Sequence, residues 1–355
     1  MSAADGSLGA RNVFASVSVL TQIWEQVLQR GPIRPDEDFF DLGGNIPQAV
    51  FLLDEVERRT GLRLPLTALP GALTVASMTK LIGRSPAAAS PLAMIRIGAK
   101  WEPPVFLTHG AGGCVLEAYP IGRQIRWSGT IYGIQADGLH GVGPPRLHIE
   151  DMAQFAYDAI LTRQPRGPYY LVGISSGGLV MLETALRLLA RNERVGLLAF
   201  VDTYPHPKRW PVSCWIDHVF HRSKRYAAML RELSLNESIP QVLSLPMKIA
   251  RHLRYRAGEP LRIGSESDAC TPAGLNQLQT AYALAIAGYR PRPFPGVVRF
   301  LKAAVHTSFP NNPTAVWGAI GQRLDIEQIA CEHVQMITTH SAETADWISR
   351  CLDQA

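Results

Sequence analysis

Two features of the sequence predict an α/β fold with a mostly parallel sheet, preceded by a small helical domain. From residue 105 onward, short apolar runs alternate with amphipathic segments, which is typical of parallel strands covered on both faces by helices. Within this region, residues 169–190 read as an apolar strand, a glycine-rich turn and an apolar helix. Before residue 84 the apolar positions follow a helical period instead, and the 355-residue chain is long enough for both units.

The composition contains no signature of nucleic-acid or membrane binding. A net charge of +5 is modest, so no nucleic-acid partner is expected. No apolar run is long enough to span a membrane, and Met1–Arg11 contains an acidic residue and lacks the apolar core of a signal peptide. The five cysteines follow neither C-x-x-C nor metal-ligand spacing, which favours a reducing compartment. We therefore expect a cytoplasmic protein without a metal site.

The first 83 residues are expected to fold into a small bundle of short helices. Val13–Leu28 has a helical period with its apolar residues on one side. Pro47 can occupy the first turn of a second helix that runs to about Arg59, and Gly61 can act as its C-cap. Thr74–Ile82 is expected to form the last helix.

A motif in this region resembles the peptidyl or acyl carrier domain of nonribosomal peptide and polyketide synthases. Residues 39–45 read Phe-Phe-Asp-Leu-Gly-Gly-Asn, close to the family pattern D-x-F-F-D-L-G-G-[HD]-S. The resemblance implies a four-helix carrier-like domain at 1–83. The family's serine carries a phosphopantetheine arm, but Ile46 occupies that position and no serine or threonine lies between Leu42 and Val50. No cofactor is therefore expected, and the domain is either a degenerate appendage or a docking module.

Residues 84–103 are expected to link the two domains. The run Ser85–Pro91 is small, proline-containing and uncharged, which predicts an extended and mobile segment.

The second domain is expected to span residues 104–355. Its predicted strands are Val105–Thr108, Thr130–Ile134, the strand before Ser175, Leu197–Val201, Val297–Leu301 and Ile326–Ala330, and its predicted helices are Met152–Thr162, Leu179–Ala190 and Ala342–Leu352. Functional groups in such sheets lie beyond the carboxyl ends of the strands, which is where Gly110, Ser175 and Asp202 are placed.

Ser175 is the candidate nucleophile. It is the central residue of a G-x-S-x-G pattern between Gly173 and Gly177, in the strand–turn–helix context that this pattern requires. The tight turn presents the hydroxyl above the sheet, and the helix behind it directs free N–H groups at a developing oxyanion. The expected oxyanion donors are the backbone amides of Ser176 and Ala111.

An acid and a base complete the expected triad in the chain order of the α/β-hydrolases. Asp202 ends the strand after the nucleophile helix, although a turn aspartate before a proline is an alternative reading. His333 follows a late strand and is the expected base, with His340 as the second candidate and His306 as the third. His109 borders the oxyanion loop and is expected to be structural.

These motifs carry a second resemblance. Pro104 to about Asp353 is similar to the thioesterase domain that ends nonribosomal peptide synthetases. The resemblance implies that Ser175, Asp202 and His333 act as triad, with a helical lid at about 205–288. It implies a partner too, an acyl or peptidyl carrier protein or synthase module that supplies a thioester. The family's glycine–aspartate before the histidine is replaced here by Cys331-Glu332.

The sequence thus favours a thioesterase that releases its acyl group by hydrolysis or cyclisation. An acyltransferase that passes the group to an amine or alcohol is the enzymatic alternative, and a non-catalytic docking scaffold is the other. The basic residues of the predicted lid fit either contact with an acidic carrier surface or a solvated helix face.

Overall fold

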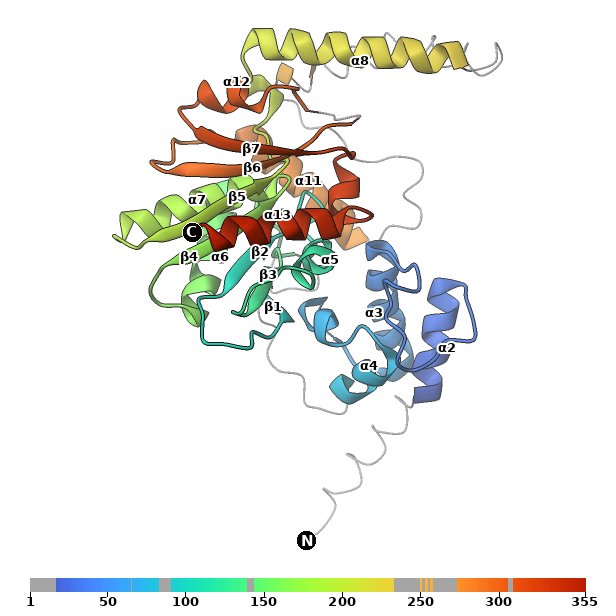
Figure 1. Cartoon of the computed structure of the whole chain (residues 1–355). Helices are drawn as coiled ribbons and strands as arrows, with labels where there is room; N and C mark the ends of the chain where they lie inside the picture. The colour runs from blue at the N-terminus through green and yellow to red at the C-terminus, as the bar shows by residue number, and fades with distance from the viewer. Residues whose placement is uncertain are drawn as a thin grey trace.

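A seven-stranded sheet forms the centre of the larger part of the molecule (Figure 1). The computed structural model describes residues 17–64, 66–82, 91–138, 144–232, 250, 253–254, 256–257, 273–305 and 309–355. The strands are β1 (Leu92–Arg96), β2 (Val105–Thr108), β3 (Ile131–Ile134), β4 (Tyr169–Ile174), β5 (Val195–Val201), β6 (Val297–Ala303) and β7 (Arg323–Ile329). Their order is β1-β3-β2-β4-β5-β6-β7, and every neighbouring pair is parallel except β1 with β3.

The central strands β2, β4 and β5 are buried on both faces, which explains why they are continuously apolar. Along β2 and β5, Phe106 and Phe200 belong to one core cluster, whereas Leu107 and Val201 belong to the other. The first cluster includes residues of α6 (Ile149–Arg163) and α7 (Gly177–Ala190). The second includes residues of α5 (Tyr119–Gly122) and α13 (Ser341–Asp353). Alternate residues along each strand therefore face the two helical layers on opposite sides of the sheet.

Other helical segments lie in the connections. After β2 comes η2 (Val115–Ala118), and between β5 and β6 come η3 (Pro207–Arg209), α8 (Val212–Glu232) and α11 (Ala273–Gly288). The last connections contain α12 (Pro313–Gly318) and η5 (Val334–Ile337). Figure 1 shows α8 beyond α12, at the end of the molecule opposite to the N-terminal helices. No helix in the described ranges combines the length and apolarity needed to cross a membrane.

The N-terminal helices are α2 (Val17–Leu28), α3 (Ile46–Thr60), η1 (Leu66–Gly71) and α4 (Val75–Ile82). Asn45 caps α3 in a capping box, since its side chain accepts from the Gln48 N–H while the Gln48 side chain accepts from the Asn45 N–H. Pro47 lies in the first turn, and Gly61 ends the helix with a φ of 69°. Trp24 and Phe39 pack edge to face, 5.3 Å apart, in the interior of this bundle.

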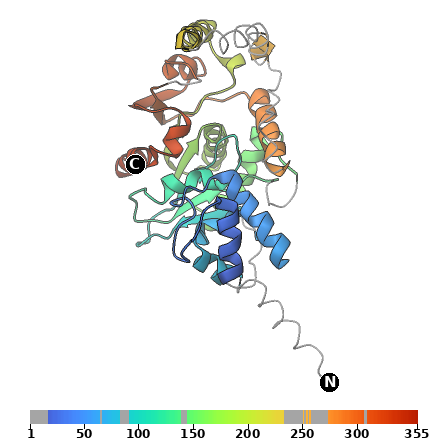
Figure 2. The ribbon, with the colours of Figure 1, turned by 90° about the vertical axis from the view of Figure 1, so that its right-hand side faces the viewer.

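This bundle packs against the sheet domain beside β1 and α5 (Figures 1 and 2). The rings of Phe40 and Tyr119 stack 5.7 Å apart, and Asp41 accepts a hydrogen bond of 3.0 Å from Arg123. η1 contacts β1 and η2, and the buried residues of the bundle are continuous with one core cluster of the sheet domain. The two parts therefore share an apolar interior.

Strand β1 corrects the prediction that residues 84–103 form a flexible linker. Leu92 and Ala93 are buried, and they pair with Ile134 and Gly133 of β3. That prediction followed the composition of Ser85–Pro91 and overlooked the short apolar run Leu92–Arg96 after it. This run gains hydrogen-bonding partners only when β3 is in place. Residues 83–90 lie outside the described ranges.

The contact between the N-terminal bundle and the sheet domain predicts that loss of the Phe40 ring lowers stability more than loss of the Phe51 ring. Replacing Phe40 by alanine should lower the free energy of unfolding by about 1–3 kcal/mol, since a half-buried ring and its stacking partner lose contact. Phe51 on α3 is 42% exposed and provides the matched control, for which little change is expected. Urea unfolding of both variants measures the difference. Equal stability of the two variants would contradict the packing described here.

Candidate active site

Ser175 occupies the tight turn between β4 and α7. Its φ of 51° lies in the left-handed region, which is uncommon for a residue with a side chain. A Cβ atom at Gly173 would collide with the backbone of Gly178, and one at Gly177 would collide with the carbonyl oxygen of His109. The pattern therefore needs glycine because the turn is packed against its neighbours. Ser175 remains partly exposed between buried residues.

The structure joins Ser175, His333 and Asp202 in one chain of hydrogen bonds. His333 Nε2 lies 2.9 Å from Ser175 Oγ, and His333 Nδ1 lies 2.7 Å from Asp202 Oδ2. Because a carboxylate only accepts, Nδ1 carries the proton and Nε2 is free to accept from the serine hydroxyl. Asp202 is fully buried, and its other oxygen accepts from the Ala303 N–H at 3.3 Å.

The turn after β7 delivers His333 to this position. Val305 N–H donates to the Cys331 carbonyl at 3.1 Å, and Glu332 N–H donates to the Gln335 side chain at 2.9 Å. The Cys331-Glu332 pair is therefore compatible with an imidazole that reaches both partners. The ring of Phe309 packs edge-on against His333 at 5.0 Å.

The other candidate histidines lie elsewhere. His340 precedes α13 and faces Glu343 at 4.0 Å, and His306 lies outside the described residues. His109 is buried, which lowers its pKa to about 4. Its Nδ1–H donates to the Gly110 carbonyl at 2.8 Å, so Nε2 accepts from the Tyr282 hydroxyl at 3.2 Å. This neutral imidazole joins α11 to the loop after β2.

The backbone amides of Ala111 and Ser176 are the predicted oxyanion donors. Neither the Ala111 N–H nor the Ser176 N–H donates to another group within the described part of the chain. Ser176 is the N-cap of α7, where the helix dipole also favours negative charge. Their role as oxyanion donors, expected from the sequence, stays a prediction.

Sequence reasoning missed Glu117, which lies on η2. Its Oε2 accepts the Gly110 N–H at 2.5 Å. Burial raises the pKa of the Glu117 carboxyl to about 7, against the opposing effects of the Gly110 N–H and of His333. A single glutamate among apolar residues has no recognisable sequence signal, because its partner is a backbone amide seven positions away.

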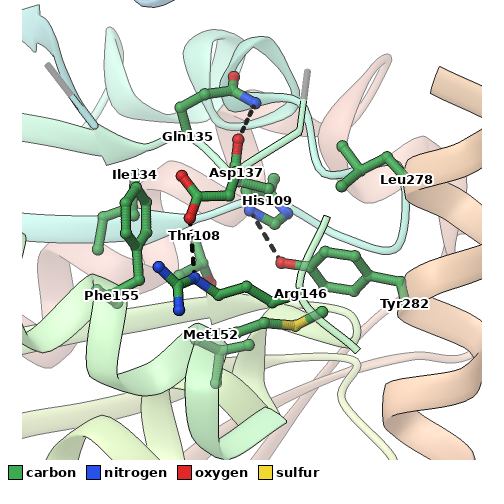
Figure 3. Close-up of a pocket in the computed structure, with 13 residues that line it drawn as sticks. Thr108, His109, Ile134, Gln135, Asp137, Arg146, Met152, Phe155, Leu278 and Tyr282 are labelled. Carbon is green, nitrogen blue, oxygen red and sulfur yellow. Dashed lines mark hydrogen bonds and ion pairs between the residues drawn. The ribbon is translucent and has the colours of Figure 1, made fainter. Parts of the chain in front are cut away.

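A small pocket adjoins the same loop (Figure 3). Figure 3 shows Asp137 and Arg146 facing each other, and Arg146 Nε lies 2.8 Å from Asp137 Oδ2. The Arg146 guanidinium also lies over the Phe155 ring at 5.1 Å. The Thr108 hydroxyl lines the pocket, is buried and has no hydrogen-bond partner. No group of three metal-ligating side chains occurs among the residues that the structure describes.

Ile46 does not fit the phosphopantetheine group that a carrier domain holds. It is the first residue of α3 and packs partly buried against the bundle. Attachment requires a side-chain oxygen, and isoleucine has none. The neighbouring polar side chains of Asn45 and Gln48 are already engaged in the capping box.

The mostly parallel sheet, with Ser175 after β4, Asp202 after β5 and His333 after β7, is typical of the α/β-hydrolase fold. Two stretches of the chain match models of known protein families. Residues 103–213 match the thioesterase domain, and residues 18–82 match the phosphopantetheine attachment site. The chain is therefore similar to a carrier-type domain over residues 18–82 and to a thioesterase domain over residues 103–213.

Parts of the chain are similar to nonribosomal peptide synthases and related synthases. The chain is 34% identical over 190 residues to a dimodular nonribosomal peptide synthase of Bacillus subtilis, covering 53% of this chain and 8% of that protein. It is 31% identical over 184 residues to an indigoidine synthase of Streptomyces lavendulae, covering 51% and 14%. The chain thus spans about a tenth of these relatives' length. A solved four-domain nonribosomal peptide synthetase bound to AMP and glycine shares the fold, with a TM-score of 0.55, 24% identity, and coverage of 95% of this chain and 26% of that one.

The raised pKa of Glu117 predicts a pH-dependent stability. Between pH 4.5 and about 7 the unfolded chain releases the Glu117 proton and the folded chain keeps it, so this group lowers stability as pH rises. Glu117→Gln removes that loss, and the variant should gain roughly 2–3 kcal/mol on the wild type over this window. Thermal unfolding at pH 5 and pH 7.5 measures it. The exposed Glu343→Gln variant is the control, and a constant difference for Glu117→Gln would refute the prediction.

Proposed function

We propose that this protein is a serine thioesterase that takes an acyl or peptidyl group from a carrier-protein thioester onto Ser175. It then releases the group by hydrolysis or cyclisation in nonribosomal peptide or polyketide biosynthesis. The observation that carries the proposal is the hydrogen-bond chain from Asp202 through His333 to Ser175, beside the unpaired amides of Ala111 and Ser176. The match to the thioesterase family supports the choice of substrate class.

Acylation begins when Ser175 Oγ attacks the thioester carbonyl. A serine hydroxyl is a weak nucleophile near neutral pH, so His333 Nε2 takes its proton as the new C–O bond forms. Buried Asp202 stabilises the resulting imidazolium and keeps its Nδ1 proton in place. The two amides bind the oxyanion, and loss of one such donor typically costs about 3 kcal/mol. The C–S bond then breaks, and the thiol leaves with the proton from His333.

Release repeats these steps with a second nucleophile. Water, or a hydroxyl or amine within the acyl chain, gives its proton to His333 Nε2 while attacking the ester carbonyl. Collapse of the tetrahedral intermediate returns the proton to Ser175 and frees an acid or a cyclic product. An external amine or alcohol in the same position would give the acyltransferase alternative.

The domain assignment is part of this proposal: a carrier-like domain at 1–83, a thioesterase domain at 104–355 and a lid at about 205–288. Helix α11 supports the proposed lid, because its Leu278 and Tyr282 contact the loop after β2. The proposed partner is a separate carrier protein or synthase module. The proposed location is the cytoplasm, with which the free cysteines Cys114, Cys214, Cys331 and Cys351 are compatible.

The proposed triad predicts selective losses of reactivity. A fluorophosphonate probe should label the wild type, and labelling should be lost in Ser175→Ala. His333→Ala should slow labelling and single-turnover acylation by orders of magnitude, since it removes the imidazole that hydrogen-bonds to the serine hydroxyl. His340→Ala is the matched control, because this histidine lies outside the hydrogen-bond chain. Full labelling of Ser175→Ala, or equal losses in both histidine variants, would overturn the assignment. Mass analysis of the products would distinguish an acid, a cyclic product and an amide or ester.

The substitution at Ile46 predicts that the N-terminal domain is never loaded and that substrates arrive in trans. Incubation with coenzyme A and a broad phosphopantetheinyl transferase should leave the mass of the protein unchanged, because the site has no oxygen nucleophile. Ile46→Ser should gain one arm, since the surrounding helix and loop are in place. A stoichiometric gain by the wild type would refute the prediction. Failure of Ile46→Ser to be modified would show that more than the serine is missing.

A further inference from the structure

We propose that Glu117 is a positioning residue for acyl transfer, which holds the loop 109–113 so that the Ala111 N–H faces the oxyanion. The inference rests on the proposed function of Ser175. Glu117 Oε2 accepts the N–H of Gly110, the residue directly before Ala111. This bond fixes the peptide on one side of the proposed donor, while Gly113 N–H donates to the Gly110 carbonyl at 3.2 Å on the other side.

The carboxyl group lies next to the reaction centre. A Cβ atom added at Gly110 would lie 2.8 Å from Glu117 Oε2 and 3.4 Å from Ser175 Cβ, so both atoms surround the same point. A Cβ atom at Gly112 would collide with Glu117 Oε1. The two glycines therefore leave room for a carboxyl group against the inner side of the loop, within a few ångströms of the serine.

The backbone that carries Glu117 is itself fixed. Glu117 N–H donates to the Cys114 carbonyl at 3.1 Å, which closes the turn of η2. The Gln135 side chain accepts the Val115 N–H at 3.0 Å and donates to the Gly113 carbonyl at 2.7 Å. Gln135, which directly follows β3, thus anchors both the start of η2 and the end of the loop. A carboxyl group on so rigid a support can define the position of the peptide that it contacts.

Acceptance of the Gly110 N–H does not require a negative charge. Among the described residues, the titratable side chains that interact electrostatically with Glu117 include His333, Tyr282 and Cys114, and none of them hydrogen-bonds to its carboxyl group. A neutral carboxyl still accepts through its carbonyl oxygen, and it places no negative charge beside a developing oxyanion. Glutamine preserves this acceptor, whereas methionine has a similar length and cannot accept in its place.

The test compares Glu117→Gln, Glu117→Met and Glu117→Asp in the full chain. Fluorophosphonate labelling rates and the kcat and KM of a small acyl thioester are measured from pH 5.5 to 8.5, with thermal unfolding as a check of folding. The labelling rate and kcat of Glu117→Gln should stay within about threefold of the wild-type values. The pH profile of this variant should show no titration step near pH 7. Glu117→Met should lower the labelling rate and kcat about 10- to 100-fold with little change in KM, because the oxyanion donor is displaced. Glu117→Asp should lose as much, since its shorter side chain withdraws from Gly110.

The controls separate this inference from the proposed function. Glu183→Gln alters another buried carboxyl, held by Tyr289 and Arg292, and should change stability without changing kcat. A wild type that is neither labelled nor active would refute the proposed function. An active wild type with Met and Asp variants as fast as Glu117→Gln would overturn the positioning role. Equal loss in Glu117→Gln and Glu117→Met would also overturn it, since charge and not acceptance of the Gly110 N–H would then matter. If Glu117→Met fails to fold, the Asp variant alone decides.

Discussion

The site depends on one imidazole that reaches two partners far away in the sequence. His333 lies 131 positions from Asp202 and 158 from Ser175, and its two ring nitrogens hydrogen-bond to both. The parallel sheet makes this possible, because β4, β5 and β7 end at the same edge and place their following turns side by side. The unusual backbone conformations follow from the same requirement. Ser175 and Asp202 both have positive φ values, which the packed strands around them sustain.

The sequence predicted those features that arise from local patterns. Strand Val105–Thr108 has the expected bounds, the turn at Ser175 has the expected strand and helix on either side, and Gly61 caps its helix. Short apolar runs and glycine placement are enough for these. Strand β1 was missed because its role depends on pairing with β3. The choice of His333 over His340 followed from position in the chain, and the geometry agrees with it, although their roles in catalysis remain proposals.

The N-terminal domain shows why a carrier-type fold can persist without its serine. Its stability comes from a core built around Trp24 and Phe39 and from the capping box of Asn45 and Gln48. None of these contacts needs a side-chain oxygen at position 46. Replacing a serine by Ile46 adds apolar contact with the bundle. The fold and the ability to be loaded are thus separable properties, which explains how the family match and the missing attachment site coexist in one chain.

The packing of that domain bears on the active site through η2. On one side η1 contacts η2, and Phe40 stacks on Tyr119 immediately after it. On the other side η2 carries Glu117, whose carboxyl group accepts the N–H of Gly110 in the proposed oxyanion loop. The N-terminal bundle therefore packs against η2, and η2 in turn holds the loop 109–113 through Glu117. Contact alone does not make the two domains allosterically coupled. Coupling requires a structural element with two arrangements, and both sites must shift the equilibrium between them. The anchoring of η2 by Gln135 favours a fixed support over a switch, so the N-terminal bundle can contribute to the geometry of the proposed acyl transfer without carrying a phosphopantetheine arm.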